Sequence, residues 1–506
     1  MTKKVIINRF DGGMTLDPRG AWNEAQLVKH FDNFTRKHSL IPYRKSVSCY
    51  AAQTTNELQN FIYYNYNTYM LGRVGGSGTD KYAVKLFLKN DLTPTDASAA
   101  TGGAGSNTTE TANSWLVNPA LFVEYKDVFW GAYSASGKLW SYTLSTTTLN
   151  EAAETIAFTN CAQGIIHSKT DYLYVPLDNK IYYKADSAAF ALGLTLPSNL
   201  VITSICEYGN YLAIACRPNY YGSVNSKVFL WDLTSTSWNE QIDYGIGDLL
   251  VLENLDGYLI GVSSLISDVS YPNSKLIFNK YGGGGAIKFK EILWTNDGAA
   301  RRTFLPKQKY NNRLFFGLSN ASSVDLTNHN LTGIWVVGRN DENSQFSVIL
   351  DRIANNATEV KTITGFIFAQ NYAIISYTDT SDAHGISITT NGLVGGQTTA
   401  KYDTISEYRT TLNPGMSEGD KIHKKQLTSN ALLYDFYSDI SPSIELQYAV
   451  DGGSFTSIFT DTTITNTFKE IVSQFSAGRE YEFKIISKGV EITGLVYNYE
   501  VLKSQI

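Results

Sequence analysis

The sequence is poor in cysteine, methionine and proline, and these scarcities exclude several classes of protein. It has 4 Cys, 4 Met and 11 Pro in 506 residues. Four cysteines are too few for a scaffold held by disulfides, and their spacing relative to the 6 His does not resemble a zinc site. Charged residues make up only 18%, the formal net charge is −5, and no long run of one sign occurs. The chain therefore lacks the basic footprint of a protein that binds nucleic acid tightly.

Long apolar runs and enzyme motifs are missing as well. No run of about 18 apolar residues occurs, so we expect no membrane span, and the start MTKKVIINRFDGG lacks the apolar core of a signal peptide. The sequence has no GxSxG, P-loop, HExxH or CxxC motif. We expect a non-enzymatic protein made in a cytoplasm, with no catalytic residues, no metal site and no cofactor.

Aromatic residues are abundant instead. The chain has 33 Tyr, 24 Phe and 8 Trp, and aromatic residues, like Thr, favour pleated and half-buried surfaces. The composition therefore predicts an all-β fold.

The stretch Tyr208–Ile242 contains a strand, a turn, a second strand and a polar turn, and variants of this pattern recur along the chain. Seven strand pairs can be aligned. Their opening strands contain NTYMLG (67–72), DVFWGA (127–132), DYLYVP (171–176), NYLAIA (210–215), GYLIGV (257–262), NRLFFG (312–317) and NYAIIS (371–376). Their second strands contain KYAVKLFL (81–88), GKLWSY (137–142), NKIYYK (179–184), SKVFLW (226–231), SKLIFN (274–279), TGIWVV (332–337) and HGISIT (384–389).

Repeats of this size predict one supersecondary unit copied around a fold. A four-stranded antiparallel blade needs roughly 40–50 residues, and strands such as NYLAIAC are apolar on both faces, as in a sheet enclosed by two neighbours. The small Ala213 and Ala215 suggest an inner strand. We predict a β-propeller of about seven blades, with six or eight as alternatives, over residues 61–412.

The two ends of the chain do not follow the repeat. Residues 1–60 are predicted to brace the propeller or contact neighbours, with a short strand at Val5–Ile7 and a short helix at Ala21–His30. Near Leu412 the pattern stops at a run of turn-forming residues. After it, alternation of Ile444, Leu446 and Tyr448 with polar residues predicts a half-buried strand. We predict a small C-terminal β-sandwich over 421–506.

Several acidic residues are candidates for the catalytic carboxylates of a glycoside hydrolase. Such an enzyme needs two carboxylates that face each other across a sugar. Several of the candidates stand beside strand starts or turns, where Asp more often accepts hydrogen bonds from backbone N–H groups than performs acid–base chemistry. We favour that structural interpretation for Asp127, Asp171, Asp232, Asp256 and Asp351.

The order of these parts resembles virion proteins of tailed bacteriophages, in particular the propeller-bearing tail nozzle, tail hub and DNA-stabilisation proteins. The resemblance rests on the opening NRFDGGMTLDPRG, on the irregular propeller, and on a closing sandwich that ends ITGLVYNYEVL. The F-x-G-G stretch at Phe10–Gly13, followed by Asp17, carries the local likeness.

The resemblance implies a virion protein made in the bacterial host, with copies forming a ring, such as a hexamer, around the DNA exit channel. Other tail or portal-adaptor proteins would be partners, and DNA would pass without sequence recognition. A near-neutral or acidic channel suits sliding phosphate. Candidate subunit-contact residues are Arg9, Phe10, Asp11, Gly12, Gly13, Asp17, Arg301 and Arg302.

Two other functions remain open. A propeller at the tail tip would bind a receptor or a glycan, with Tyr220 and Tyr221 as candidate loop contacts. A glycan-cleaving propeller enzyme is the third hypothesis, and it requires the carboxylate pair.

Overall fold

The computed structural model of the chain describes residues 2–15, 19–21, 23–29, 31–32, 39–42, 47–53, 56–64, 67–74, 120–133, 138–143, 148–219, 225–265, 274–296, 305–319, 321–322, 332–339, 344–352, 360–369, 372–381, 383–390, 405–437, 441–473 and 475–502. Strands dominate these residues, and the one helix among them is α1 (Glu418–Lys421). The all-β prediction is confirmed.

The chain forms two compact units. One comprises Val47–Gly333 and Ala357–Ile388, and we call it the propeller unit; the other comprises Met1–Ser46, Ile334–Asn356 and Thr389–Ile506, and we call it the sandwich unit. Both ends of the chain therefore belong to the same unit.

In the described residues, the propeller unit contains strands of seven successive antiparallel sheets. Three of them are four-stranded meanders, β8–β11, β12–β15 and β16–β19, and the following sheet adds β26 to β20–β23. The strands of the first five sheets are β6 (Asn56–Tyr64), β7 (Asn67–Val74), β8 (Ala120–Tyr125), β9 (Val128–Tyr133), β10 (Lys138–Thr143), β11 (Thr148–Thr155), β12 (Ile165–His167), β13 (Tyr172–Leu177), β14 (Lys180–Lys184), β15 (Ala191–Thr195), β16 (Leu200–Tyr208), β17 (Tyr211–Pro218), β18 (Lys227–Trp231), β19 (Glu240–Asp243), β20 (Asp248–Leu255), β21 (Tyr258–Leu265), β22 (Ser274–Tyr281), β23 (Ala286–Asn296) and β26 (Ala321–Ser322).

The last two sheets complete a ring. They contain β24 (Lys307–Tyr310), β25 (Arg313–Leu318), β29 (Val360–Ala369), β30 (Tyr372–Asp379), β31 (His384–Thr390) and β5 (Val47–Gln53). Although β5 comes first in the unit, it pairs with β31, so Ser387 lies opposite Ser48. Strand β29 of this sheet contacts β6 of the first sheet. The first and last sheets thus meet, and the predicted β-propeller is confirmed.

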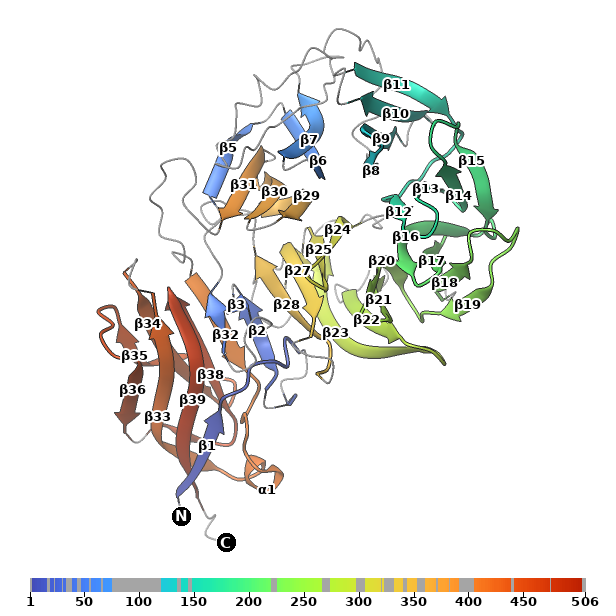
Figure 1. Ribbon diagram of the computed structural model, residues 1–506. Helices are drawn as coiled ribbons and strands as arrows, with labels where there is room; N and C mark the ends of the chain where they lie inside the picture. Colours follow the sequence, from blue (N-terminus) through green and yellow to red (C-terminus); the bar gives the residue numbers. More distant parts are fainter. Residues whose placement is uncertain are drawn as a thin grey trace. The chain divides into compact units, whose positions relative to one another are not determined.

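The first strand of each sheet lies on the inside of the ring. Figure 1 shows β8, β12, β16 and β20 inside and β11, β15 and β19 outside. The strands we aligned as opening strands are second strands: β9, β13, β17, β21, β25 and β30 follow β8, β12, β16, β20, β24 and β29. Ala213 and Ala215 therefore belong to the second strand, and the prediction of an inner strand was wrong. The segment KYAVKLFL (81–88) lies outside the described residues.

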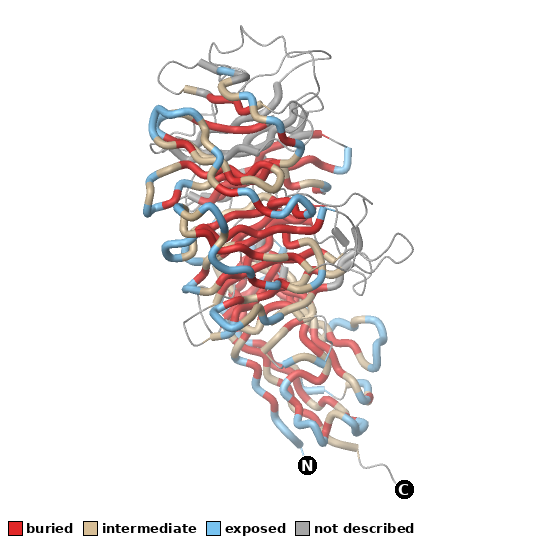
Figure 2. The backbone as a smooth tube through the Cα atoms, turned by 90° about the vertical axis from the view of Figure 1, so that its right-hand side faces the viewer, coloured by how far each residue is buried: buried red, intermediate tan, exposed pale blue. Residues whose placement is uncertain are grey.

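Apolar side chains cover both faces of these sheets because each sheet packs between two others. In β17 all residues after Tyr211 are buried. Ile214 and Phe229 belong to one buried cluster, whereas Ala213 and Val228 belong to another. Figure 2 shows buried residues along the strands and exposed residues at their turns. Hydrophobic burial between sheets thus stabilises the ring.

The sandwich unit has two sheets. One has the order β1-β39-β33-β36, with β37 also pairing with β33, and the other includes the consecutive strands β27-β28-β2-β32-β38-β34-β35. Their strands are β1 (Thr2–Ile7), β2 (Ala25–Lys29), β27 (Gly333–Gly338), β28 (Ser347–Arg352), β32 (Ile405–Thr410), β33 (Lys425–Phe436), β34 (Ser443–Val450), β35 (Thr456–Asp461), β36 (Phe468–Val472), β37 (Ala477–Gly478), β38 (Tyr481–Lys488) and β39 (Val490–Val501). A short pair, β3 (Phe31–Asp32) with β4 (Ile41–Pro42), completes the unit.

The core of the sandwich unit follows the predicted alternation. Ile444, Leu446 and Tyr448 are buried in β34. Across the two sheets, the rings of Phe483 and Tyr497 lie 4.9 Å apart between their centroids. Alternating apolar side chains thus fill the space between the sheets.

The N-terminal residues differ from their prediction. The strand expected at Val5–Ile7 is present as part of β1, which pairs with β39. The helix expected at Ala21–His30 is absent from the described residues of that stretch, and β2 pairs with β32 and β28 instead. Tertiary pairing overrides the weak helical propensity there. The observed sandwich therefore takes strands from both ends of the chain, and β5 and β6 extend the ring to residues before 61.

Candidate functional site

Tight turns join the first and second strands of successive sheets in the propeller unit. The turns carry positive φ angles at Asp127 (65°), Asp256 (51°) and Asn312 (55°). Two-residue hairpin turns of this kind favour Asn, Asp and Gly because those residues tolerate positive φ. Side chains beside these turns form hydrogen bonds to the neighbouring sheet, and together they form a polar site of the propeller unit.

Lys307 is at the centre of this site. Its side chain is only 6% exposed. From β24, its ammonium donates to the carbonyl of Ile205 in β16 at 2.9 Å and to the carboxylate of Glu253 in β20 at 3.1 Å, and also to the carbonyl of Leu252. One cation therefore connects three successive inner strands.

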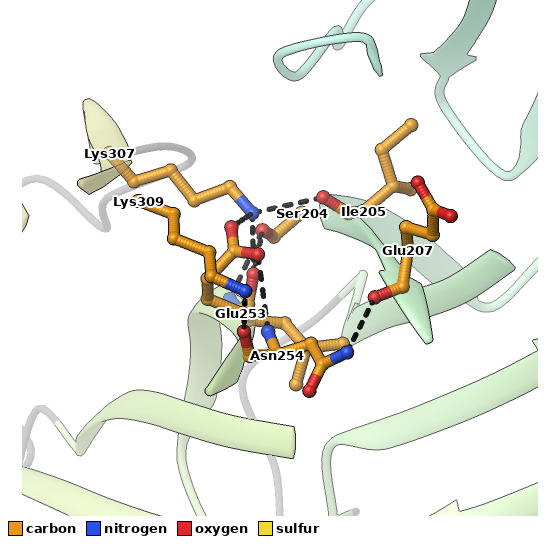
Figure 3. Close-up of polar contacts among 8 residues, drawn as sticks. Ser204, Ile205, Glu207, Glu253, Asn254, Lys307 and Lys309 are labelled. Carbon is orange, nitrogen blue, oxygen red and sulfur yellow. Dashed lines mark hydrogen bonds and ion pairs between the residues drawn. The ribbon is translucent and has the colours of Figure 1, made fainter. Parts of the chain in front are cut away.

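The contacts continue on both sides of Lys307 (Figure 3). Lys309 donates to the carbonyl of Asn254 at 2.6 Å, and the amide of Asn254 donates to the carbonyl of Glu207 at 3.2 Å. Ser204 accepts a hydrogen bond from the backbone N–H of Leu252 at 3.1 Å. Each contact joins one inner strand to the next.

Other neighbouring sheets are connected in the same way. Tyr125 donates to the carbonyl of Asp171 at 3.0 Å, and the hydroxyl of Ser168 donates to the Glu207 carboxylate. The amide of Gln308 exchanges two hydrogen bonds with the backbone of Phe368, at 2.9 and 2.7 Å. We call these contacts the inner ties; they involve Tyr125, Ser168, Ser204, Glu207, Glu253, Asn254, Lys307, Gln308 and Lys309.

The inner ties leave little reactive capacity. The side chain of Lys307 is engaged by two carbonyls and one carboxylate, so its hydrogen-bonding capacity is used within the fold. The Glu253 carboxylate accepts from this cation, and the Glu207 carboxylate accepts from Ser168. In physical terms the arrangement satisfies polar groups inside a ring and fixes neighbouring sheets together.

Four of the candidate acidic residues lie in turns of the described chain. Asp127, Asp171 and Asp256 occupy positive-φ turn positions. Asp232 accepts from the backbone N–H groups of Ser235 and Thr234, and these hydrogen bonds hold the pKa of its carboxyl well below the usual range. The expected hydrogen bonds from backbone N–H groups are confirmed for Asp232. For Asp127, Asp171 and Asp256 the structure shows the turn position, and the side chain of Asp351 lies outside the described residues.

Two buried cysteines are likewise unreactive. Cys206 lies opposite Ala213, and Cys216 lies opposite Ile202. Both are free thiols, and burial raises their pKa values. Among the described residues, no group of three or more His, Cys, Asp or Glu side chains is placed to hold a metal ion.

The predicted F-x-G-G stretch packs inside the sandwich unit. Phe10 is 1% exposed, and its ring meets Tyr408 edge-on at 5.3 Å. A Cβ atom on Gly12 would lie 2.6 Å from the carbonyl oxygen of Asn23, and Gly13 has a φ of +70°. These residues therefore form a turn and a core contact within the chain.

Charge is also satisfied within this turn. Arg9 pairs with Asp11, which accepts a second hydrogen bond from Asn23 at 2.9 Å. Burial raises the pKa of Asp11, but the contacts with Arg9 and Asn23 outweigh it, so the net pKa is lowered. The other predicted contact residues, Asp17, Arg301, Arg302, Tyr220 and Tyr221, lie outside the described residues.

The inner ties could not be predicted from any motif in the sequence. Lys307 and Glu253 are far apart in the chain, and no local motif connects them. One feature of the sequence could have indicated the inner ties. Polar residues recur just before the turn into the aligned strands, as at Glu207, Asn254 and Lys309.

Comparisons with known proteins give likenesses of fold at low similarity. No family model matches the chain, and no curated protein matches its sequence. Virginiamycin B lyase from Staphylococcus aureus is 12% identical, with a TM-score of 0.39, over 68% of this chain and 98% of that protein. Sqt1 from Saccharomyces cerevisiae is 9% identical, with a TM-score of 0.38, over 68% and 98% of the two chains.

A prolyl endopeptidase structure is 9% identical, with a TM-score of 0.38, over 71% of this chain and 55% of that one. These proteins have different activities, and their similarity to this chain extends to the fold alone. Within the described residues, no helix has the length and apolar character needed to cross a membrane.

Proposed function

We propose that this protein is a structural component of a bacteriophage tail or portal–tail connector, and that copies of it form a ring around the DNA exit channel. One observation carries the proposal: the buried and turn-bound polar groups of the propeller unit are used to hold the fold together. Lys307 and Glu253 connect inner strands, and Asp232 organises a turn. A protein selected for rigidity fits a structural role.

Charge supports the same proposal. A protein that grips DNA concentrates Lys and Arg, whereas a channel that lets phosphate slide does not. The net charge of −5 and the short supply of charged residues agree with a sliding surface. The resemblance of the chain's layout to propeller-bearing tail proteins adds the partners: copies of itself and neighbouring tail or portal-adaptor proteins.

The experiment combines assembly state with virion composition. Mass photometry and negative-stain microscopy of the purified full chain should show closed rings, and mass spectrometry of purified virions should detect the chain. A protein that stays monomeric and is absent from virions would contradict the proposal.

A receptor- or glycan-binding propeller is the competing function. It would require accessible aromatic platforms, but Tyr183 stacks on Tyr172 at 5.8 Å and packs against the core. Binding to a glycan array by the full chain, lost on substitution of an exposed tyrosine such as Tyr211, would favour this alternative over the ring.

A further inference from the structure

The sheet β1-β39-β33-β36 of the sandwich unit has two edge strands that pair on one side only among the described residues. Strand β1 pairs with β39, and β36 pairs with β33. An edge strand presents unpaired N–H and C=O groups, and natural proteins normally protect such edges or use them for association. Both edges of this sheet are therefore available for a further strand.

The directions of the two edge strands are complementary. Each neighbouring pair in the sheet is antiparallel. With four strands, β1 and β36 run in opposite directions. A second copy placed beside the first by a rotation presents its β1 antiparallel to β36, so the sheet continues with its pattern of hydrogen bonds preserved.

The outer face of the sheet carries exposed apolar side chains at both edges. Ile6 on β1 is 54% exposed, and Phe468 and Val472 on β36 are 48% and 78% exposed. Between the edges, Ile6 is paired with the half-buried Val496, Val496 with the buried Ala431, and Ala431 with Glu470 on β36. Exposed apolar side chains therefore lie at both edges of the sheet, where a neighbouring strand could cover them.

Charges of opposite sign lie beside these apolar side chains on the same face. Lys4 is exposed on β1, and Glu470 is exposed on β36. A single antiparallel register places Phe468 opposite Ile6, Glu470 opposite Lys4, and Val472 opposite Thr2 of the next copy. Because side chains alternate with a period of two, all three pairs lie on the outer face.

We propose that β36 of one copy pairs with β1 of the next copy in this register. The inference rests on the proposed function, since it names the surface through which the ring would assemble. The occupant is a second copy because the two edges of one sheet match each other in direction, apolar character and charge. The contact is heterologous, and heterologous contacts close into rings when the rotation permits.

Cysteine cross-linking tests the register directly. Within one chain, Ile6 and Phe468 are separated by β39 and β33, or about 14 Å at the usual strand spacing, which is too far for a disulfide. The full chain carrying both Ile6→Cys and Phe468→Cys should therefore form a ladder of covalent oligomers on a non-reducing gel. Each single variant can join at most two copies and serves as the control.

The outcomes separate the interface from the function. A double variant that yields no more cross-linking than the single variants overturns the interface, even if wild-type rings form and virions contain the chain. A ladder from a protein that is absent from virions supports the interface and contradicts the tail function.

A charge exchange provides an independent measurement. Lys4→Glu or Glu470→Lys alone should weaken self-association about tenfold, because like charges then lie opposite each other. The double exchange should restore self-association, since the two facing residues again carry charges of opposite sign. Equal losses in the single and double variants would overturn the register.

Discussion

At the scale of the residue, the Asp420 carboxylate is a test of how the N-terminal strand is held. It accepts hydrogen bonds of 2.7 Å from Lys3, Tyr499 and Ser417. These contacts hold the pKa of the carboxyl well below its usual range. A group with a lowered pKa in the folded state stabilises that state above its unfolded pKa, and the stabilisation is lost as the pH falls toward the folded pKa.

Asp420→Asn should therefore lower the free energy of unfolding at pH 7 by about 2 kcal/mol. The difference from wild type should shrink as the pH falls below about 4, because Asp420 of the unfolded wild-type chain then binds a proton that the folded carboxylate, with its lowered pKa, does not bind. Urea denaturation at several pH values measures this. Glu418→Gln is the matched control, since that side chain is 88% exposed; an equal effect of both changes would contradict the assignment.

Lys307 is the corresponding residue in the propeller unit. Lys307→Met removes the cation and leaves the Glu253 carboxylate, whose side chain is 14% exposed, without its charged partner, which should cost about 3 kcal/mol. Lys309→Met, two residues along the same strand, removes an exposed lysine that donates to one carbonyl, and should cost less than about 1 kcal/mol. Differential scanning calorimetry compares the two. Similar costs would mean that Lys307 does not connect the inner strands.

Residue-level prediction worked where the chemistry is local and failed where it is not. The turn role of Asp232 follows from neighbours within a few positions, such as Ser235. The Lys307–Glu253 pair joins residues 54 positions apart, and nothing near either residue identifies the other. Exposure could not be read from the sequence either: Phe10 was a candidate contact and is buried.

At the scale of the element, ring closure depends on β5. This strand precedes the first sheet in the chain but pairs with β31 in the last one. A propeller closed in this way joins distant parts of the chain. Loss of the pairing between β5 and β31 should therefore loosen the first and last sheets together.

A disulfide across this junction tests the closure. Ser48→Cys and Ser387→Cys replace residues that lie opposite each other. The oxidised double variant should gain about 3–5 kcal/mol of stability relative to its reduced form, because the bond constrains a very long loop in the unfolded chain. Thermal unfolding with and without reductant measures the gain. Failure of the disulfide to form in the folded protein would contradict this strand pairing.

The periodic strands were predictable because burial imposes their pattern. Ile444, Leu446 and Tyr448 alternate as a half-buried strand requires, and the aligned second strands of the repeat are third strands of their sheets, such as β18. The less apolar first strands, such as Lys307–Tyr310, carry no such signal. The stretch Ala21–His30 was misassigned as a helix because its pairing with β32 depends on residues far away.

At the scale of the whole molecule, the propeller and the sandwich could be predicted from the sequence, but which strands belong to each unit could not. The propeller was predictable because seven similar strand pairs follow one another in the sequence. That β1 and β2 join the sandwich unit was not, because such pairings join residues hundreds of positions apart, as in Val5 with Tyr497. Contacts between residues so far apart in the chain produce no recognisable pattern in the local sequence.

The central claim is that this propeller protein assembles with itself into a structural ring of a virion. The most direct measurement is mass photometry of the purified full chain at nanomolar to micromolar concentration, with negative-stain images of the same sample. The claim predicts one discrete species at a whole-number multiple of the chain mass, such as six, that appears in images as a closed ring. A single monomer peak at every concentration, with no rings in the images, would contradict it.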